Sequence, residues 1–152
     1  MRGKAELKKI HRVVDANYNR AKEGLRVCED IARFIFDNQS LTRRFKYLRH
    51  GLGEAISAFG LKDIVVARDI VGDVGRMTIS SESRRKGLAD IFYANVQRVK
   101  ESLRVLEEFA KLKDLKAAEQ LKRLRYKVYD LEKEVLGKLS VISHPRHRGL
   151  RL

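Results

Sequence analysis

A run of eighteen residues occurs twice in this chain, and its polar members could bind an anion. Residues 16–33 read ANYNRAKEGLRVCEDIAR and residues 94–111 read ANVQRVKESLRVLEEFAK, with ten identical positions at an offset of 78. The planar guanidinium of arginine matches the geometry of a phosphate group. Arginines that face one pocket between the copies would therefore form a phosphate site. The repeated residues that could build such a site are Asn17, Asn95, Arg20 and Arg98.

The helical periodicity of the repeat predicts which of these side chains face the core. At about 100° per residue, Arg20 falls within about 20° of Val27 and Ile31. Arg20 and its equivalent Arg98 are therefore predicted to lie on the buried arc. A charge on a buried arc needs a partner or a ligand. Two interpretations remain open: a buried Arg–Glu network that fastens the helices together, or an anion pocket between the two copies.

The other repeated charges fall elsewhere on the helix. Glu23 and Glu101 lie on the edge of the apolar arc, where their carboxylates could hold a metal ion. Four further repeated charges point away from the arc and are predicted to form surface pairs along each helix. They are Glu29, Glu107, Lys22 and Lys100.

The loop ARDIVGDVGR at 67–76 is a second candidate site. Charged side chains surround Gly72 and Gly75 at close spacing: Arg68, Asp69, Asp73 and Arg76. Such a loop could present backbone N–H groups and an arginine to phosphates, and carboxylates to Mg²⁺. An ordinary turn with a salt bridge would have the same sequence.

The elements that must position these residues are predicted to be helices, because the chain has one proline, Pro145. A second echo, RFKYLRHGL against QLKRLRYKV, follows each copy of the repeat. We therefore expect an all-α fold, in which a duplicated helical hairpin forms a four-helix-type bundle with a long irregular loop at about 60–83. The helices are expected at about 4–37, 40–60, 83–112 and 115–138.

The expected organisation is a single helical domain over 1–142, with repeat halves at about 4–60 and 83–138, followed by a basic tail at 143–152. Ser40 and Asp114 are the expected N-caps of the second and fourth helices, and Gly137 is placed near the end of the last.

Composition favours a cytoplasmic protein that binds anions. The formal net charge of +14 predicts attraction to nucleic acid, nucleotides or phosphorylated metabolites. No apolar run approaches the roughly 20 residues that span a bilayer, and no signal peptide is evident. The one cysteine, Cys28, is expected to be an inert core residue. Few Asn and Gln beside abundant Lys, Arg and Glu are typical of a thermophile.

Three segments together resemble a known family. DANYNRAKEGLRVCEDIARF at 15–34, RDIVGDVGR at 68–76 and ANVQRVKESLRVLEEFAKL at 94–112 are similar to the small helical hydroxymethylpyrimidine-phosphate kinase family of thiamine biosynthesis. Members occur alone or as the N-terminal domain fused to thiamine-phosphate synthase, so a synthase name would reflect fused relatives. Relatives tend to read R-D-T-x-x-D-x-G in the loop, and this chain has Ile70 in place of the threonine.

The resemblance implies phosphoryl transfer from ATP, with Mg²⁺, to hydroxymethylpyrimidine phosphate. The product would be the pyrimidine diphosphate that the synthase consumes. The implied catalytic residues are Arg68, Asp69 and Asp73, and the two aspartates, with Glu23 and Glu101 as further candidates, would be the metal ligands. The implied substrate and phosphate ligands are Asn17, Arg20, Asn95, Arg98, Gly75 and Arg76. Tyr18 and Phe92 could stack on a ring or belong to the core.

The expected partners follow from the same resemblance. Thiamine-phosphate synthase is a candidate functional partner, a homodimer is compatible with the long apolar helix at 115–138, and no membrane contact is expected. Two other functions remain open. A nucleic-acid-binding helical module would explain the charge, although acidic residues recur inside the repeat. A non-catalytic structural or regulatory bundle predicts that no cleft lies beside the loop at 68–76.

Overall fold

The computed structural model describes residues 3–77 and 84–143, which form helices and no strand. The predicted all-α fold is therefore confirmed. Two of the helices continue in another geometry: α1 extends into a π-helix at Ile31–Ile35, and α2 into a 3₁₀-helix at Ser57–Phe59. The α-helices are α1 (Lys4–Asp30), α2 (Gln39–Ile56), α3 (Leu61–Val66), α4 (Leu88–Ala110) and α5 (Leu115–Ser143).

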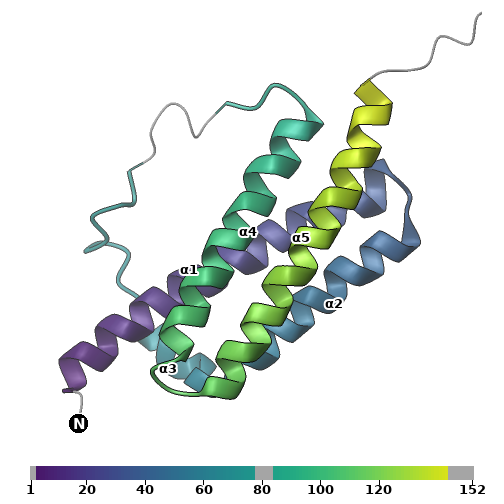
Figure 1. Ribbon diagram of the computed structural model, residues 1–152. Coiled ribbons are helices and arrows are strands. Elements are labelled where there is room, and N and C mark those ends of the chain that lie inside the picture. Colours follow the sequence, from purple (N-terminus) through teal and green to yellow (C-terminus); the bar gives the residue numbers. More distant parts are fainter. Residues whose placement is uncertain (1–2, 78–83, 144–152) are drawn as a thin grey trace, which may run out of the picture.

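The long helices form two hairpins, as the repeat predicts. Helix α1 packs on α2 within the first hairpin, and α4 packs on α5 within the second. The hairpins then meet through α1 against α4 and α2 against α5. Figure 1 shows that α1 and α4 run in opposite directions, and the short α3 lies against the N-terminal half of α1. The arrangement is a bundle in which each long helix packs mainly on two other long helices.

A glycine lets α1 and α4 approach closely. A Cβ atom on Gly24 would lie 2.7 Å from the Cγ2 atom of Val99 and 2.9 Å from the backbone oxygen of Asn95. A backbone carbonyl inside a helix cannot move aside, so a larger residue would push the helices apart. The equivalent position of the second copy is Ser102, which is also small and buried. The two copies therefore meet through equivalent surfaces.

The core is built from the apolar stripes that the periodicity predicts. In α5 the whole stripe is buried: Leu121, Leu124, Val128, Leu131 and Val135. Phe92 is fully buried in α4 and Tyr18 is packed against the core, so the core interpretation of these two rings is confirmed. Within the described residues, no helix combines the length and hydropathy that crossing a membrane requires.

Several predicted helix ends were wrong for local reasons. The first helix does end close to the predicted residue 37, because the π-helix continues from α1 to Ile35 and the chain turns at Asp37, which has a positive φ of 48°. Asn38, not Ser40, caps α2, because its side-chain oxygen accepts the N–H of Leu41 at 2.9 Å. Gly137 lies inside α5. Helix α4 begins at Leu88, not near 83.

Asp114 does cap α5, as predicted, by accepting the N–H groups of Lys116 and Ala117. The basic tail beyond Ser143 lies outside the described residues.

The loop predicted at 60–83 begins with a helix that the periodicity did not reveal. Gly60 adopts a φ of 78°, a conformation that favours glycine, and reverses the chain into α3. Ile64 is then fully buried, and Ala67 nearly so. Six residues are too few for a clear helical period in the sequence. Helix α3 brings Arg68 to the side of α1.

Cys28 is buried in the core, and burial raises the pKa of its thiol to about 12. Only the thiolate is a good nucleophile. We expect no reaction of the native protein with a disulfide reagent at pH 8, and full reaction after denaturation. Measuring thionitrobenzoate release with and without guanidinium tests this expectation, and rapid labelling of the native protein would contradict it.

Candidate functional site

A cleft of about 640 Å³ lies between the N-terminal half of α1 and the segment that follows α3. We call it the Arg68 cleft. Helix α1 supplies one wall, and the loop predicted to carry chemistry supplies the other. The lining residues are Lys9, Arg12, Val13, Asp15, Ala16, Asn17, Asn19, Arg20, Arg68, Asp69, Ile70 and Asp73. The predicted loop therefore does join residues of the repeat around one cavity.

A two-point ion pair fastens the loop to α1. The Nε and Nη2 atoms of Arg68 donate to the two carboxylate oxygens of Asp15 at 2.7 and 2.8 Å. The Asp15 side chain is 5% exposed and that of Arg68 is 41% exposed. The hydrogen bonds to Asp15, followed by its charge, raise the pKa of Arg68. Asn19 also donates to Asp15 at 3.2 Å. Asp15 thus anchors Arg68 through Nε and Nη2, and these two donors are not free for a ligand.

Each of the two loop aspartates, Asp69 and Asp73, uses one carboxylate oxygen to stabilise a turn. Oδ1 of Asp69 accepts the N–H of Gly72, and Oδ1 of Asp73 accepts the N–H of Gly75, both at 2.9 Å. A Cβ atom on Gly72 would collide with the Asp69 carboxylate. The second oxygen of each aspartate has no hydrogen-bond partner among the described residues. Two such carboxylates beside a phosphate suit Mg²⁺, which commonly binds one or two carboxylates together with phosphates and water.

Three cations of the cleft are available for a ligand. Lys9, Arg12 and Arg20 line the Arg68 cleft and have no ion-pair or hydrogen-bond partner in the part of the chain that the structure describes. Asp15 already neutralises Arg68. The three free cations share the lining of the cleft with the carboxylates of Asp69 and Asp73. The cleft can therefore hold an anion and, beside it, a divalent cation.

The asparagines of the repeat are used identically in both copies. The amide nitrogen of Asn17 donates to the Val13 carbonyl at 2.9 Å, and that of Asn95 donates to the Ile91 carbonyl at 2.8 Å. Each bond spans one helical turn and leaves the Oδ1 atom as an acceptor. Asn17 is buried and lines the Arg68 cleft, whereas Asn95 does not line it.

The prediction that the repeated arginines lie on a buried arc was wrong. Arg20 and Arg98 are both exposed. The apolar arc of α1 lies further round the helix, because α2, α3 and α4 all contact α1. Arg98 does not line the Arg68 cleft, so this cleft is not the predicted pocket with walls from both copies. Of the described residues, none from the second copy lines the Arg68 cleft.

The prediction that Glu29 and Glu107 are surface residues was wrong as well. Their side chains are 4% and 5% exposed. Glu29 accepts from Nε of Arg49 at 2.8 Å, and Glu107 accepts from Nε of Arg125 at 3.2 Å. The repeated arginines of the preceding turn add a second cation to each glutamate, Arg26 at 3.5 Å and Arg104 at 3.3 Å. The buried Arg–Glu network exists, but it uses these residues and not Arg20 or Arg98.

The repeated lysines differ between the copies. Lys22 is exposed, as predicted, with its ammonium 4.6 Å from the centre of the Tyr18 ring. Lys100 is largely covered and pairs with Glu132 of α5 at 2.9 Å, so its assignment to the surface was wrong.

Four other predicted site residues lie outside the Arg68 cleft: Glu23, Glu101, Gly75 and Arg76. All four are exposed. The described residues contain no group of three or more His, Cys, Asp or Glu side chains that could hold a metal ion. The metal role predicted for Glu23 and Glu101 therefore has no support from neighbouring acidic ligands, and Asp69 and Asp73 could hold Mg²⁺ only together with phosphate and water.

The sequence did not single out Lys9, Arg12, Asp15 or Asn19 as site residues. Asp15 has no equivalent in the second copy, where Tyr93 stands, so the repeat gave no signal for it. Lys9 and Arg12 precede the repeated segment. Only the position of Asp15 and Arg68, at the start of two recognisable motifs, could have suggested that they meet.

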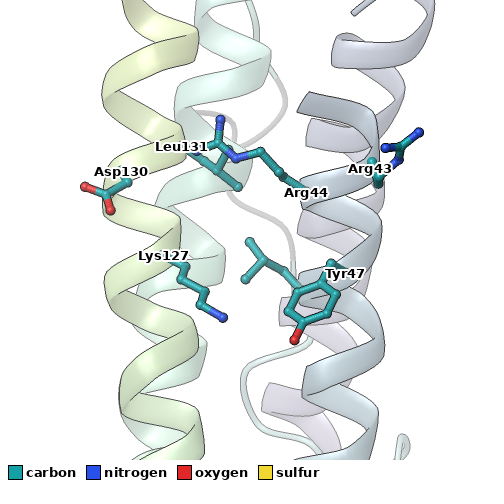
Figure 2. A pocket seen from close by; sticks show the side chains of 7 residues that line it. Arg43, Arg44, Tyr47, Lys127, Asp130 and Leu131 are labelled. Carbon is teal, nitrogen blue, oxygen red and sulfur yellow. The ribbon is translucent and has the colours of Figure 1, made fainter. Parts of the chain in front are cut away.

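A second groove lies on the other side of the bundle, between α2 and α5 (Figure 2). Its volume is about 430 Å³, and the core residues Leu48 and Leu131 contribute to its lining. The ammonium of Lys127 lies 5.0 Å from the centre of the Tyr47 ring. None of the residues predicted to carry chemistry lines this groove. The Arg68 cleft therefore remains the candidate site, and its presence differs from what a non-catalytic bundle predicts.

Comparison with known proteins assigns the family. The model of the ThiD2 family matches residues 12–134. The chain belongs to the ThiD2 family. The match contains α1 from Arg12, the Arg68 cleft apart from Lys9, and most of α5, so this ThiD2 chain carries its candidate site within the family region.

Curated relatives bear the name thiamine-phosphate synthase. The protein from Synechocystis is 43% identical over 129 residues, which cover 84% of this chain and 36% of the relative. The protein from Rhodopirellula baltica is 38% identical over 140 residues, which cover 91% of this chain and 37% of the relative. The ThiD2 chain thus spans little more than a third of these relatives. No solved structure matches it.

Proposed function

We propose that this ThiD2 chain transfers the γ-phosphoryl group of ATP to hydroxymethylpyrimidine phosphate. The observation that carries the proposal is the Arg68 cleft, which gathers three free cations beside two carboxylates. Phosphoryl transfer depends mainly on positioning and on charge stabilisation of the transferring group. The family membership and the synthase names of the relatives support a role in the same biosynthesis.

The chemistry needs little proton transfer from the protein. An oxygen of the substrate phosphate, already ionised, forms a bond to the γ-phosphorus, while the bond to the β–γ bridging oxygen breaks and ADP leaves. Mg²⁺, when bound, would neutralise charge on the phosphate oxygens, and Asp69 and Asp73 would hold it through their unpaired oxygens. Arg20 would bind the transferring group, and Lys9 and Arg12 the neighbouring phosphate. Asp15 fixes Arg68, and therefore the start of the loop, against α1.

The test is a turnover assay with purified protein, hydroxymethylpyrimidine phosphate and Mg-ATP, in which phosphorus NMR identifies the diphosphate and ADP. Arg20→Ala is expected to lower kcat/KM by about 10- to 100-fold, since a charge-assisted hydrogen bond contributes about 1.5–3 kcal/mol. Arg123→Ala is the matched control, because Arg123 is an exposed arginine of α5 that lines neither cleft. Absence of diphosphate with the unchanged chain would refute the proposal.

A further inference from the structure

Some of the charged residues that recur in both copies do not take part in ion pairs that stabilise the fold. Arg20, Glu23 and Arg98 form no hydrogen bond or ion pair with the described residues. Glu101 only accepts a long bond of 3.4 Å from its neighbour Gln97. The repeated residues Glu29 and Glu107, in contrast, are buried in ion pairs. Residues that are identical in both copies, exposed and unpartnered are the ones that a ligand would use.

The crossing of α1 and α4 places these free charges on one face. Gly24 lies against Asn95 and Val99, and the two helices run in opposite directions (Figure 1). The stretch from Arg20 to Glu23 is therefore opposite the stretch from Arg98 to Glu101. Antiparallel helices that pack through equivalent surfaces are related by a local two-fold axis, which puts equivalent residues on the same side of the pair. Both arginines thus flank the crossing on the same face.

This face adjoins the Arg68 cleft. Asn17 and Arg20 line the cleft, and they lie about two turns and one turn before Gly24, the residue of α1 that approaches α4. Arg20 therefore stands between the cleft, which holds the carboxylates, and the part of the face that carries Arg98. The proposed reaction brings together two phosphorylated reactants, and each needs cations for its own phosphates.

We propose that Arg98 and Arg20 together form a second anion subsite across the α1–α4 crossing. This subsite binds the polyphosphate of a nucleoside triphosphate, and the Arg68 cleft binds the phosphate of the small substrate. The assignment rests on the proposed function and divides its two reactants between the two subsites. Arg20 borders both subsites. It neutralises charge on the transferring γ-phosphoryl group as the bond to the substrate oxygen forms and the bond to ADP breaks.

The assignment is tested by calorimetric titration of the full chain with two separate probes. One probe is the magnesium complex of adenosine 5′-(β,γ-imido)triphosphate, and the other is hydroxymethylpyrimidine phosphate. Arg98→Ala is expected to weaken binding of the nucleotide about tenfold and to leave binding of the pyrimidine within twofold. Arg20→Ala should weaken both. Arg123→Ala should change neither, and circular dichroism confirms that each variant is folded.

Three outcomes separate this assignment from the proposed function. If Arg98→Ala binds the nucleotide as well as the unchanged chain does, or if the unchanged chain does not bind it, the subsite assignment is overturned. If the subsite variants behave as expected but no diphosphate forms, the subsite stands and the kinase does not. If diphosphate forms and Arg98→Ala loses no affinity, the kinase stands without this subsite.

Discussion

Glu29→Ala is expected to lower the free energy of unfolding by about 3–5 kcal/mol, because it leaves a mostly covered guanidinium without its counter-charge. Arg49 reaches Glu29 with two nitrogens, at 2.8 and 3.3 Å, and its own side chain is only 16% exposed. The pair joins α1 to α2. Urea unfolding followed by circular dichroism measures the change.

Glu23→Ala is the control for that measurement. It also removes a glutamate that recurs in both copies, but from an exposed position of α1. Surface substitutions usually change stability by less than about 0.5 kcal/mol. Replacing both partners, Glu29→Leu with Arg49→Leu, should restore much of the loss, since an apolar pair leaves no buried charge. A single-variant loss below about 1 kcal/mol would contradict the structural role given to this pair.

Asp15→Ala is expected to lower kcat/KM for diphosphate formation about 100-fold, a loss typical of catalytic groups displaced by about 1 Å. Both carboxylate oxygens of Asp15 accept hydrogen bonds from Arg68. This contact fixes the start of the loop, and therefore the positions of Asp69 and Asp73. The global stability should change less than in Glu29→Ala, because water reaches the 41% exposed Arg68 side chain. Turnover and urea unfolding are measured on the same preparation.

Two further measurements make this second prediction independent of the reaction. Limited proteolysis should cut the 68–77 segment faster in Asp15→Ala than in the unchanged chain. Arg68→Ala should have the same effect, and the double variant should be no worse than either single one, because both remove one contact. Additive effects, or an equally protected loop, would show that the pair does not position the segment.

The sequence was sufficient to predict the long helices and their duplication. The stripe in α5 and the offset of 78 between the copies depend only on local periodicity, which each helix carries by itself. Helix ends depend on single contacts, such as the cap that Asn38 provides to Leu41. Helix α3 was missed because one turn and a half of helix shows no period.

The placement of the charges could not be read from a single helical wheel. A wheel assigns one buried arc, but α1 contacts three other helices and is covered over much of its circumference. Glu29 can be buried there because Arg49 arrives from α2. The second echo of the sequence repeats this arginine as Arg125, so a comparison of both echoes would have indicated the two ion pairs. Asp15 gave no such sign, since its partner Arg68 is far along the chain and lies in the loop.

The contact of α1 with α4 at Gly24 lies within one chain, and for this reason the two repeat halves can differ from each other. If the two hairpins were separate, identical chains, they would form this contact only at sufficient protein concentration. Each substitution would then be present in both halves of the symmetric dimer. Within one chain the same contact does not depend on protein concentration, and the two sides can differ. One side has Asp15 where the other has Tyr93, and one has Gly53 where the other has Tyr129. A symmetric frame therefore carries the polar Arg68 cleft on one of its two sides.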